Sequence, residues 1–195
     1  MSKEKFKPEV GNEQSGVLYV PERSYEVDVI PISWGIDGGT PPGALSTLTS
    51  TNKVRYRDFS GAADNDLFFE WEKPYGQYGD VFFAVEGFIT NVVPPVSGET
   101  MMWALRGCAI YNKWLLSTAM GNYGTLTKVF DANWAQYDKF SIGFNQVVIA
   151  GLNGSSPTQE GLVLLQLKRD TLDSYEEAIG VSWLKIKYAQ KSQKI

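Results

Sequence analysis

Histidine is absent from the 195-residue chain, and cysteine occurs once, at Cys108. The lack of histidine removes the commonest general base and metal ligand, so no Ser/His/Asp or Cys/His catalytic group can form within the chain. A lone cysteine excludes an internal disulfide and a thiolate metal site, and its alternate position in the apolar run 102–110 predicts a small buried side chain. We therefore expect a protein that is not an enzyme and that carries no cofactor.

A basic stripe and a long apolar leader are also missing. The 18 Lys and Arg residues are scattered among 22 Asp and Glu residues, for a net charge of −4, which disfavours direct binding to nucleic acid. The charged N-terminal sequence MSKEKFKPEV leads into no apolar segment, so we expect neither a signal peptide nor a membrane anchor. The expected place of synthesis and folding is a cytoplasm.

Alternating apolar residues, by contrast, are abundant. Aromatic residues make up 13% of the chain, which favours strands. A short apolar run that ends at Pro21 predicts an edge strand over 17–20. Strand-like patterns, most of them with period-two alternation, predict further strands over 25–30, 54–59, 67–72, 81–85, 101–112, 126–131, 140–149, 162–169 and 181–188. The Gly-containing turn at 73–80 predicts that the strands over 67–72 and 81–85 form a hairpin. With about eight to ten strands and no persuasive helix, the fold class is all-β: a single jelly-roll-like sandwich of antiparallel strands.

The composition divides the chain into four parts. Residues 1–16 are polar and cannot bury enough surface to offset the entropy of ordering, so we expect a flexible N-terminal arm. Residues 17–53 form an extended, loop-rich interaction segment, because 33–52 is rich in Gly, Pro, Ser and Thr and too long for a tight connection. The sandwich spans 54–190, and 191–195 is a polar tail.

Two groups of carboxylates could carry chemistry. Glu70 and Glu72 share one face of a strand, which resembles the paired carboxylates of a β-sandwich glycosidase, although the solvent face of an ordinary strand shows the same pattern. Four aspartates could offer oxygen ligands to a hard cation such as calcium, or could serve in turns; they are Asp64, Asp66, Asp170 and Asp173.

Aromatic and proline residues in or beside predicted loops are the candidate contact residues. Tyr and Trp are favoured in subunit interfaces, and they could instead stack on sugars or belong to the core. The interface candidates are Trp34, Pro41, Pro42, Tyr75, Tyr78, Trp114, Tyr123 and Trp134. Lys168, Arg169, Lys185 and Lys187 lie on the last two strands, where they suit solvated faces or intersubunit ion pairs.

Two stretches carry a resemblance to a known group. DNDLFFEWEKPYGQYGDVFFAVEGF, followed by GLVLLQLKRDTLDSYEEAIGVSWLKIKY, resembles virion structural proteins of tailed bacteriophages. These typically close with a Leu-x-Leu-x-Arg-Asp segment, a nearby Asp and a terminal strand that ends in Tyr. The matching residues are Leu165, Leu167, Arg169, Asp170, Asp173 and Tyr188. The resemblance implies a jelly roll used as a capsid decoration, cement or tail-associated subunit.

The leading hypothesis is therefore a non-enzymatic virion structural protein, a capsid decoration or cement subunit that stabilises the particle through multivalent contacts. Its expected partners are copies of itself, with a trimer favoured, and the major capsid protein or other virion subunits. It would be assembled into virions in the host cytoplasm. A carbohydrate- or receptor-binding module of a phage tail or fibre is the first alternative, and a β-sandwich glycosidase is the second.

Overall fold

The computed structural model describes residues 24–48, 53–74, 77–110, 120–131, 133–149 and 161–190. These residues contain eleven strands and one 3-10 helix. In chain order the elements are β1 (Ser24–Pro31), η1 (Ile32–Trp34), β2 (Ile36–Asp37), β3 (Ser46–Thr47), β4 (Arg55–Phe59), β5 (Asp66–Lys73), β6 (Gln77–Ile89), β7 (Thr100–Ile110), β8 (Gly124–Val129), β9 (Lys139–Ile149), β10 (Gly161–Arg169) and β11 (Ile179–Gln190). The arm expected over 1–16, the strand expected over 17–20 and the tail expected over 191–195 lie outside the described residues. None of the helical structure in the described ranges is long and apolar enough to cross a membrane.

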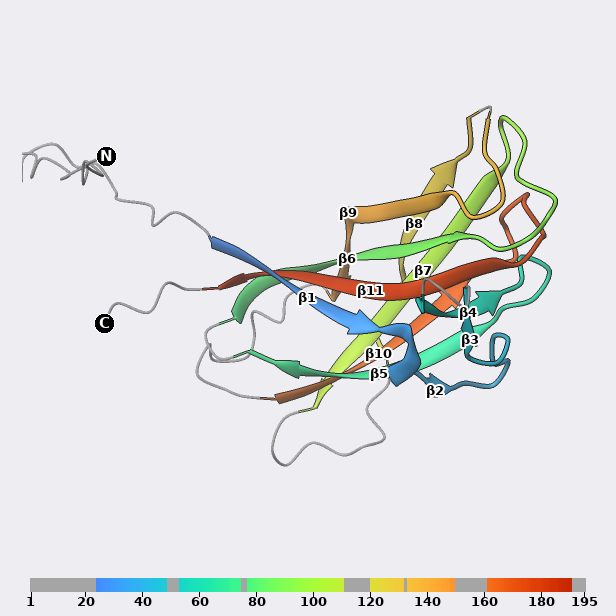
Figure 1. Ribbon diagram of the computed structural model, residues 1–195. Helices are drawn as coiled ribbons and strands as arrows, with labels where there is room; N and C mark the ends of the chain where they lie inside the picture. The colour runs from blue at the N-terminus through green and yellow to red at the C-terminus, as the bar shows by residue number, and fades with distance from the viewer. Residues whose placement is uncertain are drawn as a thin grey trace, which may run out of the picture.

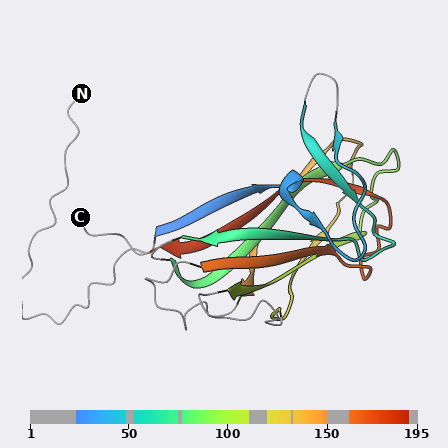
Figure 2. The ribbon, with the colours of Figure 1, turned by 90° about the horizontal axis from the view of Figure 1, so that it is seen from below.

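The strands form two antiparallel sheets that pack face to face (Figures 1 and 2). The front sheet has six strands in the order β3-β4-β11-β6-β9, and β1 pairs with β11. The back sheet has five strands in the order β2-β5-β10-β7-β8. β4 and β1 share one edge of β11, because β4 pairs with Ile179 to Val181 and β1 pairs with Trp183 to Gln190.

Most successive strands cross between the sheets, which is the jelly-roll arrangement; the exceptions are the neighbours β3 and β4 and the neighbours β7 and β8. β4, β6, β9 and β11 lie in the front sheet, whereas β5, β7, β8 and β10 lie in the back sheet. The predicted all-β sandwich is therefore confirmed. The predicted hairpin is wrong, because β5 pairs with β2 and β10 while β6 pairs with β9 and β11. An apolar face that meets the opposite sheet has the same alternation as one that lies in a hairpin.

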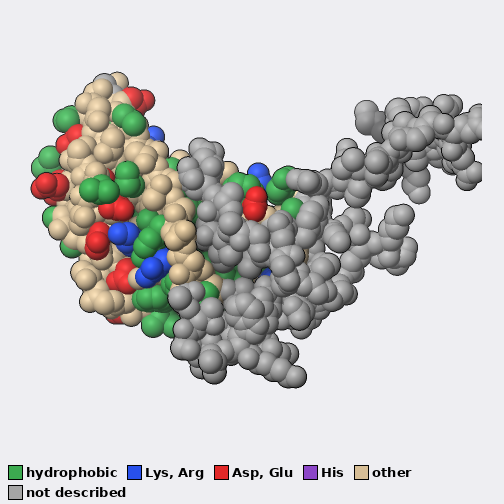
Figure 3. All heavy atoms as spheres, turned by 180° about the vertical axis from the view of Figure 1, so that it is seen from behind, with side chains coloured by type: hydrophobic (Ala, Val, Ile, Leu, Met, Phe, Trp, Pro, Cys, Tyr) green, Lys and Arg blue, Asp and Glu red, His purple; other side chains and the backbone are tan. Residues whose placement is uncertain are grey.

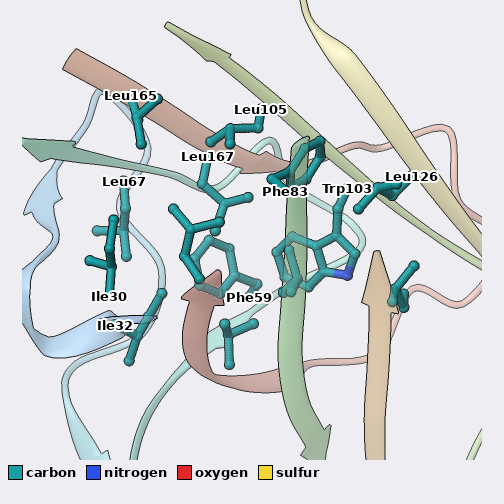
Figure 4. Packing of buried hydrophobic residues seen from close by; sticks show 14 of the residues in the cluster. Ile30, Ile32, Phe59, Leu67, Phe83, Trp103, Leu105, Leu126, Leu165 and Leu167 are labelled. Atoms are coloured by element: carbon teal, nitrogen blue, oxygen red, sulfur yellow. The ribbon is translucent and has the colours of Figure 1, made fainter. Parts of the chain in front are cut away.

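The core lies between the sheets and is built from alternate residues of the long strands. Val163, Leu165 and Leu167 of β10 are fully buried, as the alternation predicts. Figure 4 shows leucines of the back sheet converging on Phe59 and Phe83 of the front sheet. Beyond these, β1 and η1 add Ile30 and Ile32 to the same core, although both precede the expected start of the sandwich at residue 54.

The segment expected to be a long loop is described as far as residue 48, and side chains of the sandwich bond carbonyl groups of this described part. Arg57 donates from Nε to the Gly43 carbonyl at 2.9 Å and from a terminal nitrogen to the Pro42 carbonyl at 3.3 Å. Asn65 donates to the Pro41 carbonyl at 3.2 Å. Pro41 is exposed but Pro42 is buried, so only Pro41 offers its ring at the surface.

Candidate binding surfaces

The Leu-x-Leu-x-Arg-Asp segment ends in a buried ion pair. Arg169 and Asp173 have no exposed side-chain surface, and Arg169 Nε lies 2.7 Å from Asp173 Oδ2. The same guanidinium donates to the carbonyls of Phe59 at 2.7 Å, of Glu177 at 2.5 Å and of Tyr175. Arg169 therefore ties the loop over 170–178 to the end of β4, which gives this motif a packing role.

The other candidate carboxylates do not form one site. Glu70 and Glu72 are exposed on the outer face of the back sheet, opposite Leu164 and Leu162 of β10. Asp64 and Asp170 lie 3.5 and 3.7 Å from the Lys168 ammonium. Across the described ranges, no group of three or more His, Cys, Asp or Glu side chains could hold a metal ion.

Tyr123 belongs to a polar cluster on the outer face of the back sheet. Its hydroxyl donates to Gln166 Oε1 at 3.1 Å, and Arg106 Nε donates to the same oxygen at 2.7 Å. The Arg106 guanidinium also lies 4.5 Å from the centre of the Tyr123 ring. Figure 3 shows basic and acidic side chains gathered near the middle of this face. The buried Gln166 amide therefore organises the cluster.

The cluster extends to the loop that carries Pro41. Gln166 Nε2 donates to Asp66 Oδ2 at 2.7 Å, and Asp66 Oδ1 accepts from the Thr40 backbone at 3.0 Å. The network thus runs from Tyr123 to Thr40, the residue before Pro41, so these two candidates, far apart in sequence, lie at its two ends. Its polar groups are used among themselves, which suits a structural role.

The remaining aromatic candidates are separated. Trp34 in η1 is 70% exposed, whereas Trp134 is half-buried and packs edge-on against Phe130 with ring centres 5.1 Å apart. The backbone of Tyr78 pairs with β11. Tyr75 and Trp114 lie outside the described residues. No single aromatic platform is formed by the described candidates.

Cys108 is free and buried, as predicted. Burial raises the pKa of its thiol above the usual value, so the thiolate that would act as a nucleophile is disfavoured.

An unexpected surface arises from the orientation of β1. Tyr25, Val27 and Val29 point away from the core and are 44–50% exposed. Asp28 points inward, where its carboxylate accepts from the Trp71 indole at 2.8 Å and from the Tyr188 hydroxyl at 3.4 Å. This strand therefore reverses the usual arrangement of apolar residues inside and charged residues outside.

The same outer surface continues across the front sheet. The Lys187 ammonium lies 4.7 Å from the centre of the Tyr25 ring and 5.5 Å from that of Phe144. Lys185 and Lys139 both pair with Glu86, at 2.6 and 3.4 Å. We call this surface the front face; it comprises Tyr25, Val27, Val29, Phe82, Phe144 and Trp183, with Lys139, Lys185, Lys187 and Glu86.

A second apolar surface lies at the end of the sandwich where the β6–β7, β8–β9 and β10–β11 loops meet (Figure 1). Figure 3 shows hydrophobic and acidic side chains side by side over this end. We call it the loop end; its apolar side chains are 52–77% exposed and are Val92, Val93, Val96, Val129, Tyr137 and Leu172. Its exposed acidic residues are Asp131, Asp138, Glu176 and Glu177.

Hydrogen bonds between the loops hold the loop end together. The Tyr175 hydroxyl donates to the Val93 carbonyl at 2.6 Å, and the Phe130 amide donates to the Glu99 carbonyl at 2.8 Å. Burial, followed by the charge of Glu177, raises the pKa of Tyr175 to about 12, so the donating phenol stays protonated near neutral pH. The exposed side chains are thus carried on a fixed framework.

Neither surface was predicted from the sequence, because contact residues were expected in loops rich in aromatic side chains. The front face consists of strand residues, and the loop end consists largely of aliphatic ones. The alternation of Tyr25, Val27 and Val29 was visible, but period two does not tell which side faces the core.

Comparisons with known proteins add only distant similarities. No protein family matches the chain, and no curated protein matches it in sequence. The chain is similar to the CBM36-1 domain of a multidomain xylanase from the hindgut metagenome of Trinervitermes trinervoides (10% identity, 83% of this chain and 96% of that one, TM-score 0.42). It is also similar to the CBM22-2 xylan-binding domain of Paenibacillus barcinonensis Xyn10C (12%, 80% and 92%, TM-score 0.46) and to the Cry4Aa toxin of Bacillus thuringiensis (12%, 86% and 24%, TM-score 0.47). Similarities of this size assign neither a ligand nor a partner.

Proposed function

We propose that this chain is a non-enzymatic assembly subunit that acts by burying apolar surface against other proteins, and that the assembly is the virion of a tailed bacteriophage. The outward-facing apolar side of β1 carries the proposal. Exposed apolar patches rimmed by polar residues mark interaction sites, and Tyr25, Val27 and Val29 are rimmed by lysines.

The composition of these surfaces favours a protein partner. Fully burying a valine side chain is worth about 1.5–3 kcal/mol, so each half-exposed valine of the front face still offers about 1 kcal/mol on contact. Aliphatic side chains have no donor or acceptor for a sugar hydroxyl, whereas they pack well against another protein. Having two such surfaces allows each subunit several contacts, which a decoration or cement role requires.

The virion context rests on the resemblance of the two stretches to phage structural proteins. A capsid decoration or cement subunit that contacts the major capsid protein is the role that we propose. Such a role needs neither histidine nor a metal, and it needs no residue to react.

The test is the incorporation of a variant into particles of the phage that encodes this chain. In Val27→Glu/Val29→Glu the new carboxylates lie opposite Lys187 and Lys185, so cross-strand ion pairs support the fold while the face becomes polar. We expect the number of copies per particle, measured by quantitative mass spectrometry, to fall by about tenfold or more, because each lost 1.4 kcal/mol weakens binding tenfold.

Thr125→Glu/Thr127→Glu is the matched control, because it adds the same two charges to exposed positions of β8 on the back sheet. It should be incorporated normally. Full occupancy by the front-face variant, or absence of the wild-type chain from particles, would reject the proposal.

Carbohydrate binding is the second candidate, and the observation that favours it is Trp34. Its 70% exposure leaves most of the indole open, as a ring that stacks on sugars must be. A glycan array with wild-type protein and Trp34→Ala tests this candidate, since only a signal that the substitution abolishes would support it.

A further inference from the structure

We propose that the front face of one copy binds the loop end of a second copy of this chain. This inference rests on the proposed function, because it names a partner for the apolar surfaces. The contact is head-to-tail, since two different surfaces of the same molecule meet.

Apolar content is the first point of complementarity. The front face presents the side chains of β1 together with Phe82, Phe144 and Trp183. The loop end presents six aliphatic or aromatic side chains that are more than half exposed. Phe82, Phe144 and Trp183 are half-buried, whereas Tyr25, Val27, Val29 and the apolar side chains of the loop end are 44–77% exposed. Each surface therefore loses water-exposed area when it meets the other.

Charge is the second point, and it selects this pairing over the symmetric ones. Among the described residues, the lysines of the front face make ion pairs with one carboxylate only, Glu86. Lys187 instead lies between two aromatic rings. The loop end exposes four carboxylates beside its apolar side chains. The two surfaces are therefore oppositely charged.

Symmetric contacts fit less well. A contact between two front faces would bring Lys185 and Lys187 close to the same lysines of the second copy. A contact between two loop ends would bring their carboxylates together. Like charges that face each other across a contact weaken it. A head-to-tail contact uses a different surface on each partner, so repeated contacts close into a ring or continue as a filament. Either product places many copies in a regular array.

Two variants separate this contact from other modes of association. The front variant is Val27→Glu/Val29→Glu, which sets carboxylates against the acidic loop end. The loop variant is Leu172→Lys/Glu176→Lys, which sets two cations against the lysines of the front face. The control is Thr125→Glu/Thr127→Glu. A second front variant, Val27→Thr/Val29→Thr, keeps branched side chains in β1 and should weaken association in the same direction, which separates loss of contact from loss of fold.

The mass of each purified full-length chain is measured by light scattering and by sedimentation over a range of concentrations. We expect the wild type and the control to associate, and the front and loop variants each to be monomeric. An equimolar mixture of the two variants should associate again, because one intact front face and one intact loop end remain and the new glutamates and lysines carry opposite charges.

Three results would overturn the inference: a wild type that is monomeric throughout, a loop variant that associates like the wild type, or a mixture that remains monomeric. A monomeric wild type that is nonetheless incorporated into particles would reject this contact and leave the proposed function standing. Association without incorporation into particles would do the reverse.

Discussion

Replacing Arg169 should destabilise the fold more than replacing any exposed charge. The guanidinium is fully buried and donates to the Asp173 carboxylate and to three backbone carbonyls. Arg169→Met retains much of the volume but leaves a buried carboxylate without its partner. Breaking a buried ion pair from one side costs about 3–5 kcal/mol, which is a large share of a total stability of about 5–15 kcal/mol.

The measurements are thermal unfolding and urea unfolding, both followed by tryptophan fluorescence, with the urea midpoint and slope fitted separately. For a chain of this size a loss of 1 kcal/mol lowers the melting temperature by about 2–4 °C, so we expect a decrease of about 6–20 °C. Lys168→Met is the control on the neighbouring residue. Its ion pairs with Asp64 and Asp170 are long, so removing them should cost about 1 kcal/mol or less.

The ion pair also predicts non-additivity. Arg169→Met/Asp173→Leu removes both charges, and apolar replacement of a whole buried pair is often neutral or stabilising. The double variant should therefore be more stable than Arg169→Met alone. A free energy of unfolding of Arg169→Met within about 1 kcal/mol of the wild-type value would refute this reasoning. It would show that the hydrogen bonds and ion pair of Arg169 are not a principal support of this end of the sandwich.

Other buried groups make two further predictions. Burial, with the nearby charge of Asp28, raises the pKa of Tyr188 to about 12. Because the folded state holds the phenol proton more tightly than the unfolded state, the contribution of Tyr188 to stability should be intact below pH 10 and fall by about 2–3 kcal/mol as the pH rises to 12. Tyr175, whose pKa is also raised to about 12, should add a similar fall. Urea titrations between pH 10 and pH 12 should show a smaller decrease of the free energy of unfolding in Tyr188→Phe than in the wild type. An equal decrease in both proteins would contradict the assignment to Tyr188. The Cys108 thiol should resist a thiol reagent in the native protein and react with one equivalent in urea; rapid reaction of the native protein would show that the thiol is accessible.

The strands could be predicted where alternation is local. β4 was expected over 54–59 and spans Arg55–Phe59. β6 was expected to end near residue 85, because Glu86 and Gly87 interrupt the apolar pattern. The strand in fact continues to Ile89. Glu86 is accommodated by Lys185, and a Cβ at Gly87 would lie 2.0 Å from the Gly180 carbonyl oxygen. Both partners lie more than 90 residues away, so no local window contains the reason.

The candidate site was harder to predict than the fold, because a binding surface depends on which face of a strand points outward. In β1 the apolar and acidic residues alternate equally well in either orientation. The choice follows from Asp28, which accepts from the indole of Trp71, 43 positions away in the opposite sheet. A buried indole N–H that lacks an acceptor costs about 1–3 kcal/mol, and Ile30, which lies on the same side of the strand as Asp28, is buried in the core in this orientation. An acidic residue can therefore turn the apolar side of an edge strand outward, and what turns outward is then available to another subunit.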